Sequence, residues 1–532
     1  MKKIYTNGNI YTFDRIKPHV ESVVAENGRF IDMGTSEEML NQWGDSSAEI
    51  IDLNGKTATP GLVDSHLHLS MIANTFMNLD VTGVGSREDM LAKIQEKARE
   101  LKPGEWLVGS GWDENLFTDG PIPRIEELNQ AAPDNPVFIS RICGHASVVN
   151  QKALDVSGYH ADISIPEGGS IVLDEAGEPT GLLLETAAEV IKPHIPAASY
   201  EEQKNAMRKA IQFAMEKGLT SVHTNDPLHL GGLEATYRMY DELLNEEKLG
   251  LRANLLINHE FLPDLRNFGM YAGYGNNTVK IGAVKIFSDG AFGRRTALLS
   301  EPYQDDPENH GEAMYSQETL TEIVRQAREL SMPVAVHTIG DQALENVLDV
   351  LDQFPAVSHR DRLIHVQVLK SELISRLAQP SRIVDIQPRF LASDFPWVAE
   401  RLGEKRTKLS YAWKTLMDAG VICAGGSDSP VEPVDPLLGI HAAVARKAPG
   451  EQHDGWNPEE KLTMEEAFRL FTEMTAYTTN EETIKGTISR GKLADMTVFS
   501  RDPFAMSDPD ELLDTVVEMT IIGGEVKFER EA

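Results

Sequence analysis

His66 and His68 lie two residues apart at the end of a short apolar run that follows a Pro-Gly break. In an extended strand, alternate side chains project to the same side, so both imidazoles can bind one cation. Neutral imidazole is the commonest protein ligand for zinc-like metals. A His-x-His pair alone is a weak signal, because two exposed histidines on an edge strand give the same pattern. Its interpretation depends on the rest of the chain.

Other apolar runs place further possible metal ligands in or just after them. These residues are Lys285 in Val-Lys-Ile-Phe-Ser-Asp-Gly, His337 in Val-Ala-Val-His, His365 in Leu-Ile-His-Val, and Asp428 in Gly-Gly-Ser-Asp. A charged residue inside a buried strand is costly unless it is paired or bound to a cation. Because several runs carry such residues, the sequence predicts one shared metal site.

The elements that must position these residues follow a regular rhythm. After the strand that ends at His66 and His68, seven further strand-like runs alternate with helical patterns such as 200–217 and 316–331. Eight such alternations predict a (β/α)8 TIM barrel, whose strands are apolar along their length because both faces are covered. The seven runs are 220–225, 251–258, 281–288, 333–338, 362–368, 382–388 and 421–428.

Both ends of the chain depart from this rhythm. Residues 1–58 contain short strand-like pieces separated by Asn7-Gly8, Asn27-Gly28 and Asn54-Gly55, which are dipeptides of tight hairpin turns. Residues 485–532 have the same character and turn at Gly523-Gly524. Since neither end alone offers enough strands for a stable sheet, we expect both to form one composite β-sandwich domain beside a barrel domain of residues 59–484. The alternative is two separate appendages.

Residues 70–199 are inserted between the first and second predicted strands. The segment is far longer than an ordinary strand-to-helix connection, so it should have structure of its own. It leaves the barrel at the carboxyl end of a strand, which is where barrel enzymes carry their active sites. We therefore expect an inserted lid subdomain.

Composition limits the possible partners and location. The 532 residues include 50 Lys and Arg against 83 Asp and Glu, for a net charge of −33, which disfavours nucleic acid and anionic membranes. Two distant cysteines cannot form a disulfide framework, and no run is long enough for a signal core or a membrane span. We expect a cytoplasmic enzyme that acts on a small molecule.

Taken together, the motifs resemble the amidohydrolase superfamily, and specifically the YtcJ-type metal-dependent hydrolases of the amidohydrolase-3 group. The resemblance covers almost the whole chain, and the set is far more specific than His-x-His alone. The motifs that carry it are Pro60-Gly-Leu-Val-Asp-Ser-His-Leu-His68, Lys285-Ile-Phe-Ser-Asp-Gly290, His337-Thr-Ile-Gly-Asp341 and Gly491-Lys-Leu-Ala-Asp495.

This resemblance implies a centre of two divalent metal ions, with zinc as the first choice and manganese or iron as alternatives. His66, His68 and Asp428 would hold the more buried ion, and His337 and His365 the more exposed one. Lys285, carboxylated by carbon dioxide, would bridge both ions, because burial favours the neutral amine that this reaction needs. A lysine paired with Asp289 is the alternative.

The implied mechanism is hydrolysis of an amide-type C–N bond by a metal-bridging hydroxide. Two cations lower the pKa of a shared water, and the more exposed one polarises the carbonyl oxygen. Asp428 would act as general base and acid, taking the proton of the water and passing it to the leaving nitrogen.

We predict substrate contacts for Trp112, Asp113, His145, His223 and Asp289. Three of these lie in the presumed lid, in Trp-Asp-Glu and Arg-Ile-Cys-Gly-His segments. For His145, a surface or structural role is an equal alternative.

Two rival functions remain open. A deaminase on the same fold would use one metal, no bridging lysine and a Glu soon after the strand histidine, whereas His337 has no following Glu before Glu345. A non-catalytic scaffold relative is disfavoured because all six ligand positions are intact. Metal content separates the two-metal amide hydrolase from the one-metal deaminase. Similar proteins are often homodimers, so a homodimer is also expected.

Overall fold

The structure, a computed structural model, describes residues 2–120, 122–141, 145–159, 165–166, 168–395 and 397–531. The chain forms two compact units. The first comprises Met1–Ile72 and Arg208–Ala532, and the second comprises Ala73–Met207. Among the described residues, no helix combines the length and the apolar character needed to cross a membrane.

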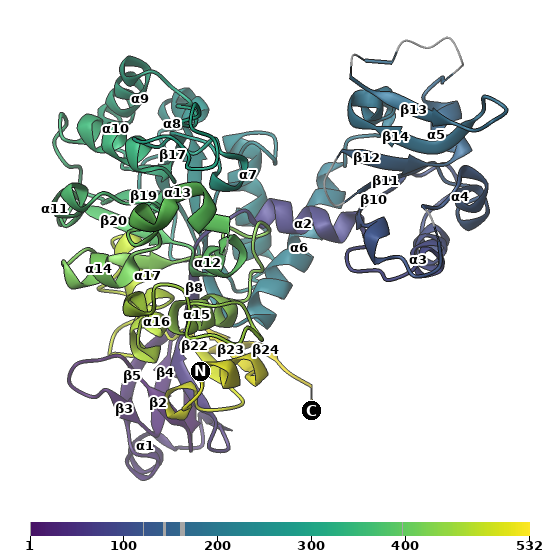
Figure 1. Ribbon diagram of the computed structural model, residues 1–532. Coiled ribbons are helices and arrows are strands. Elements are labelled where there is room, and N and C mark those ends of the chain that lie inside the picture. The colour runs from purple at the N-terminus through teal and green to yellow at the C-terminus, as the bar shows by residue number, and fades with distance from the viewer. Residues whose placement is uncertain are drawn as a thin grey trace. The chain divides into compact units, whose positions relative to one another are not determined.

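The first unit contains an eight-stranded parallel sheet in which the strands follow one another in chain order. Its last strand returns beside the first, where the backbone N–H of Asp428 donates to the carbonyl of His66 at 2.7 Å. The predicted (β/α)8 barrel is therefore confirmed. Its strands are β8 (Leu62–Leu67), β15 (Leu219–Thr224), β16 (Arg252–Asn258), β17 (Val279–Phe287), β18 (Val334–Thr338), β19 (Asp361–His365), β20 (Arg382–Ile386) and β21 (Cys423–Gly425). Figure 1 labels β8, β17, β19 and β20 of this sheet.

The sequence explains why these runs become barrel strands. Every residue of β8 and β16 is buried, since helices cover the outer face of the barrel and side chains fill its interior. The helix α9 (Gln317–Glu329) buries Leu320, Ile323, Val324 and Ala327 on one face, at the spacing expected for an amphipathic helix. Ser316 caps it by accepting from the N–H of Thr319 at 3.2 Å.

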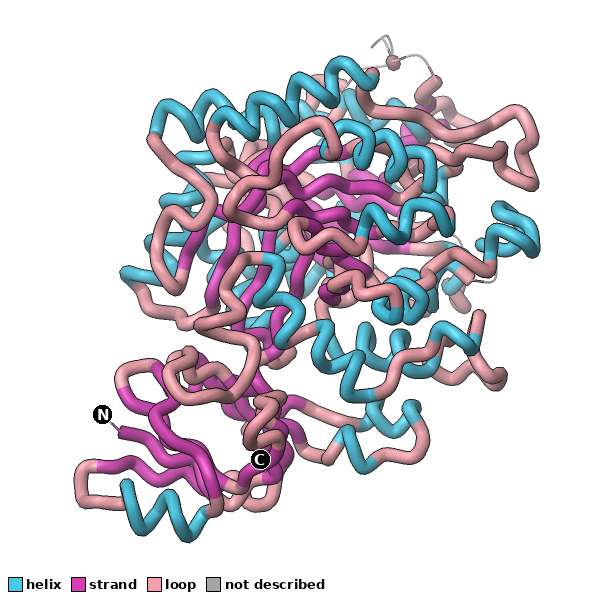
Figure 2. The backbone as a smooth tube through the Cα atoms, turned by 90° about the vertical axis from the view of Figure 1, so that its left-hand side faces the viewer, coloured by secondary structure: helices cyan, strands magenta, loops and turns pink. Residues whose placement is uncertain are grey.

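Strands from both ends of the chain form a β-sandwich in the first unit, where both termini also lie (Figure 2). Tyr5, Phe30, Met496, Val498 and Ile521 belong to its apolar core. One sheet has the order β5-β4-β1-β6 and the other β24-β23-β22-β7-β2-β3. The strands are β1 (Lys2–Thr6), β2 (Asn9–Tyr11), β3 (His19–Val20), β4 (Ser22–Glu26), β5 (Arg29–Gly34), β6 (Ala48–Asp52), β7 (Thr57–Pro60), β22 (Met496–Phe499), β23 (Val517–Ile522) and β24 (Glu525–Glu529).

The predicted hairpin turns are only partly correct. Asn27-Gly28 joins the paired strands β4 and β5, and Gly523-Gly524 joins β23 and β24, with positive φ at all four residues. Asn7-Gly8 and Asn54-Gly55 also turn the chain, but each connects a strand of one sheet to a strand of the other. The same dipeptide thus makes a hairpin only where the flanking strands pair with each other.

The second unit has a six-stranded sheet of its own, in the order β13-β14-β12-β11-β10-β9. Its strands are β9 (Leu79–Asp80), β10 (Leu107–Trp112), β11 (Val137–Arg141), β12 (Ala146–Val149), β13 (Ser170–Leu173) and β14 (Pro179–Leu184). The helices α3 (Arg87–Glu100) and α4 (Ile125–Ala131) contribute Met90, Ile94 and Leu128 to its apolar core. Its role as a lid stays a prediction.

One buried ion pair joins the barrel to the β-sandwich. Arg252 on β16 donates from Nε and Nη2 to the two carboxylate oxygens of Asp495, at 2.8 and 2.9 Å. Arg252 is 9% exposed and Asp495 8% exposed, so neither charge is well solvated. Asp495 also accepts from the N–H of Gly523 at the β23–β24 turn. Since each charge depends on the other, loss of either partner leaves a buried ion uncompensated.

We therefore expect Asp495→Ala to destabilise the first unit by about 3–5 kcal/mol, because the guanidinium of Arg252 would be left buried and unpaired. Urea unfolding followed by tryptophan fluorescence measures the change. The double variant Arg252→Met, Asp495→Leu should recover much of the loss, since it removes both charges. An unchanged unfolding midpoint for Asp495→Ala would contradict this account.

Candidate metal centre

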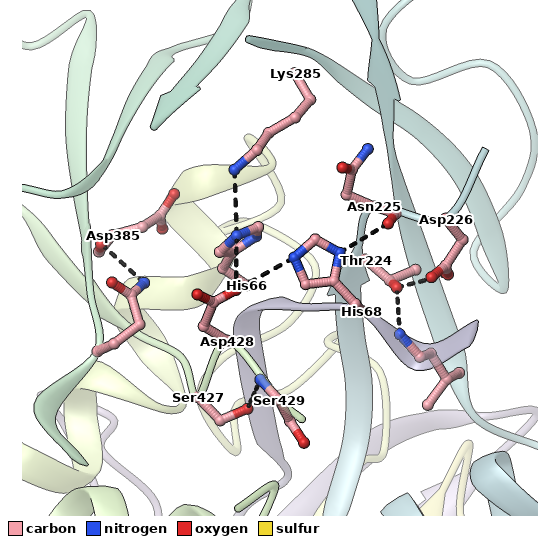
Figure 3. Close-up of polar contacts among 12 residues, drawn as sticks. His66, His68, Thr224, Asn225, Asp226, Lys285, Asp385, Ser427, Asp428 and Ser429 are labelled. Atoms are coloured by element: carbon pink, nitrogen blue, oxygen red, sulfur yellow. Dashed lines mark hydrogen bonds and ion pairs between the residues drawn. The ribbon is translucent and has the colours of Figure 1, made fainter. Parts of the chain in front are cut away.

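The six predicted ligands all lie in the first unit, at the carboxyl end of the barrel. Five strands or the residues just after them supply these side chains, which approach one another at the barrel mouth (Figure 3 shows His66, His68, Lys285 and Asp428). They are His66 and His68 from β8 and its end, Lys285 from β17, His337 from β18, His365 from β19 and Asp428 after β21.

His66, His68 and Asp428 form the tightest cluster. Nε2 of His66 and Nε2 of His68 each lie 3.3 Å from Oδ1 of Asp428. One ligand atom from each of the three residues lies within 4.8 Å of the others, which suits a shared cation. Neutral imidazole nitrogens and a carboxylate oxygen are also the donor types that zinc accepts.

Lys285 extends this cluster. Its Nζ lies 3.2 Å from Nε2 of His66 and 4.7 Å from the ring centre of Phe287. The lysine is completely buried, and in the described part of the chain no carboxylate lies within ion-pairing distance of its amine. Burial lowers the pKa of Lys285 to about 7, so a large fraction of the amine is neutral near that pH.

Asp289, the alternative partner of Lys285, is engaged elsewhere. It is 1% exposed and accepts from the backbone N–H groups of Leu298, Ile339 and Gly340 at 2.8 to 3.1 Å. Burial raises the pKa of Asp289 to about 7. These contacts tie the loop after β17 to the loop after β18. Substrate contact by Asp289 stays a prediction.

The same loops orient His337. Its Nε2 lies 3.0 Å from the carbonyl of Gly290 and 3.5 Å from Oδ1 of Asp289. With Nε2 directed at the carbonyl, Nδ1 is the ring nitrogen left for a cation. His365 lies beside it, with ring centres 4.5 Å apart. Nδ1 of His365 is buried and has no hydrogen-bond partner among the described residues, so this nitrogen is available to bind a cation.

The backbone is strained where two of these ligands lie. φ is positive at His365 (78°), Val366 (48°) and Asp428 (57°), a region that L-residues with side chains rarely adopt. Such strain persists only where surrounding contacts enforce it, and it is concentrated at functional sites. The donor set, the unpartnered nitrogen and the strain together fit a bound metal.

Electrostatics keeps four of the predicted ligands in the protonation states that metals require. His68 is the exception: burial alone would lower its pKa, but contact with the Asp428 carboxylate raises it. Burial lowers the pKa of His66, His337 and His365, so these rings are neutral near pH 7. Burial alone would raise the pKa of Asp428, but hydrogen bonds from His66 and His68 hold it well below its ordinary value. Neutral imidazoles and an ionised carboxylate are the metal-binding forms.

Two supporting residues were missed by the sequence analysis. Asp64 on β8 is completely buried and accepts from the N–H groups of His66 and Ser427, so it fixes the first strand to the loop that carries Asp428. The carbonyl of Asn225 accepts from Nδ1 of His68 at 2.9 Å, which leaves Nε2 for the metal side (Figure 3). A charge within the apolar run Leu-Val-Asp-Ser was the available signal for Asp64; Asn225 gave none.

The predicted substrate residues lie in both units. Trp112, Asp113 and His145 belong to the second unit. Trp112 is 1% exposed and donates to the carbonyl of Ile139, which makes it part of that unit's core. Asp113 accepts from Arg141 at 2.9 Å.

His145 is exposed and lies 2.9 Å from Glu185, while residues 142–144 of its motif are outside the described residues. His223 on β15 is fully buried in the first unit, and its Nδ1 lies 3.1 Å from Oγ1 of Thr478. Substrate contact by these residues stays a prediction.

Comparison with known proteins agrees with this geometry. A model of the amidohydrolase family matches residues 49–528. The chain belongs to the amidohydrolase family. YtcJ of Bacillus subtilis (strain 168) is 42% identical to it over 532 residues, which is 100% of both chains. The present chain is also 27% identical over 557 residues to the N-substituted formamide deformylase of Arthrobacter pascens, and the match covers 98% of each chain.

A solved structure supports the same assignment. An uncharacterized metal-dependent hydrolase from Pyrococcus furiosus superposes with a TM-score of 0.77 at 30% identity, covering 95% of this chain and 100% of that one. Family membership makes the present amidohydrolase a metal-dependent hydrolase.

Proposed function

We propose that this amidohydrolase cleaves an amide-type C–N bond of a small molecule at a centre of two divalent cations. The observation that carries the proposal is the convergence of four histidines and Asp428 on a buried lysine whose amine has no carboxylate partner in the described chain. A lysine buried among metal ligands as an ammonium would repel the cation they bind. The same lysine in carboxylated form would attract it.

We assign the ligands in two groups. His66, His68 and Asp428 would hold one cation, because their donor atoms already lie within 4.8 Å of one another. His337 and His365, whose rings adjoin, would hold the second. Zinc is our first choice and manganese or iron the alternatives, because imidazole and carboxylate ligands do not separate these metals sharply.

Lys285 would bridge the two groups after reaction with carbon dioxide. The neutral amine attacks the carbon of carbon dioxide, a C–N bond forms, and one proton is released, which gives a carbamate anion. Complete burial favours the neutral amine that this step needs. The carbamate supplies two oxygens and a negative charge between the cations, whereas the ammonium supplies neither.

Hydrolysis requires activation of a water, polarisation of the carbonyl and protonation of the leaving nitrogen. When bound, two divalent cations activate a water for attack and polarise the carbonyl of the substrate. Asp428 takes the proton of the attacking water and delivers it to the leaving nitrogen, so that the C–N bond breaks with a neutral amine as the leaving group. The pKa of Asp428 lies well below its ordinary value because of its contacts with His66 and His68, so the carboxylate is ionised before a cation binds. The products are a carboxylic acid and an amine.

The substrate class is narrowed by similarity. An N-substituted formamide is the substrate named for the Arthrobacter pascens relative, which spans the same length. We propose N-substituted amides with a small acyl group, formamides first. Metal content separates this function from deamination on the same fold: about two equivalents per chain support the proposal, and one equivalent supports the deaminase.

Lys285→Ala should lose most of the bound metal and nearly all hydrolytic activity, because the bridging anion is gone. Elemental analysis of the purified variant and hydrolysis of N-substituted formamides measure both effects. Added acetate or propionate should restore part of the metal and activity, since a short carboxylate can occupy the space of the carbamate. Lys280→Ala, on the same strand but at its opposite end, is the matched control and should bind metal normally. Full metal content in Lys285→Ala would refute the bridge.

Asp428→Asn should retain at least part of the metal yet lower kcat by about 10²–10⁴-fold, because the amide cannot accept the proton of water. Elemental analysis and steady-state kinetics on the same preparation distinguish lost chemistry from lost metal. Activity equal to that of the unmodified enzyme would remove Asp428 from the proton transfer.

A further inference from the structure

A rigid loop follows β15 at the mouth of the barrel. Asp226 in this loop is 1% exposed, and its carboxylate accepts from the hydroxyls of Ser70, Thr224 and Tyr240 at 2.5 to 2.6 Å. Its backbone carbonyl accepts from the N–H of His229 at 2.9 Å. These bonds fix the loop without help from a ligand.

The start of the loop is fixed to the metal centre. The carbonyl of Asn225 accepts from Nδ1 of His68, and its side-chain amide donates to the carbonyl of Leu256 and to Oδ1 of Asn258, each at 2.9 Å. Figure 3 shows Asn225 and Asp226 beside His68 on this side of the centre. The loop therefore has a defined position relative to a candidate ligand.

This loop places His229 next to His68. The two rings are nearly perpendicular, with centres 6.4 Å apart, and the side chain of His229 is exposed. Within the part of the chain that the structure describes, its imidazole makes no hydrogen bond or ion pair. By contrast, the neighbouring mouth residue His259 lies near Glu260 and Tyr315. His229 is thus positioned by its backbone and keeps its polar atoms for a ligand.

We propose that His229 is a specificity-determining residue that donates a hydrogen bond to an oxygen on the N-substituent of the substrate. This inference rests on the proposed function. Asp428 delivers a proton to the leaving nitrogen in the proposed function, and its carboxylate lies beside both His66 and His68, the second of which His229 flanks. In this inference the amine portion of the substrate lies on the His68 side of the centre, within reach of His229. Imidazole has at least one N–H in either protonation state, so donation does not depend on titration.

Two N-substituted formamides of similar shape test the proposal. N-formylglycinamide carries a carbonyl oxygen on its N-substituent, whereas N-isobutylformamide has methyl groups there. With metal-loaded enzyme, His229→Ala should lower kcat/KM for N-formylglycinamide by about 3- to 10-fold, mainly through KM, and leave N-isobutylformamide unchanged. His229→Gln should retain part of the preference because its amide donates. His453→Ala, an imidazole paired with Glu451, is the matched control and should behave as the unmodified enzyme.

Other outcomes overturn the inference. His229 does not recognise the N-substituent if His229→Ala lowers kcat/KM equally for both probes or for neither. Reduced metal content in His229→Ala would also contradict the inference. Failure of the proposed function is distinguishable, because it shows in the unmodified enzyme as an absence of metal-dependent hydrolysis. If the unmodified enzyme hydrolyses neither probe, this inference falls together with the substrate class on which it rests.

Discussion

Lys285, His66 and His365 are withdrawn from water at one end of a parallel barrel, together with the carboxylate of Asp428. Burial of so many ionisable groups is unfavourable unless they compensate one another or share a cation. The chain supplies only part of that compensation: His66 and His68 contact Asp428, but Nδ1 of His365 has no partner among the described residues. The proposed divalent centre would complete it.

The surrounding residues hold the ligands in place before any metal binds. Asp64 fixes the first strand to the last loop, Asn225 directs His68, and Asp289 ties together the loops on either side of His337. Each does so through backbone groups, which are less mobile than side chains. Positive φ angles at His365 and Asp428 show that the backbone is also strained at two ligand positions. Orientation of ligands by such contacts raises metal affinity and fixes the ring nitrogen that binds.

The barrel was predictable from sequence because its strands are short apolar runs buried on both faces, and because α9 carries a clear N-cap at Ser316. The ligand set was accessible for the same reason, since a Lys or His within such a run is conspicuous. Contacts made through the backbone leave no such trace: Asn225 acts through its carbonyl, and any residue type has one. Pairing also escaped prediction at Asn7-Gly8, where the turn is local but the partner strands are set by the sandwich. Trp112, predicted to contact substrate, is buried in an apolar core, which the sequence did not indicate, and its contact with substrate stays a prediction.

The central claim is that Lys285 bridges two cations held by the four histidines and Asp428. Anomalous X-ray diffraction at the zinc edge, from crystals grown with zinc and bicarbonate, tests it most directly. The account predicts two anomalous peaks, with ligand atoms about 2.0–2.2 Å from zinc and density for a carbamate on Lys285 that reaches both. A single peak with an unmodified Lys285, or His365 beyond coordinating distance of any cation, would contradict it.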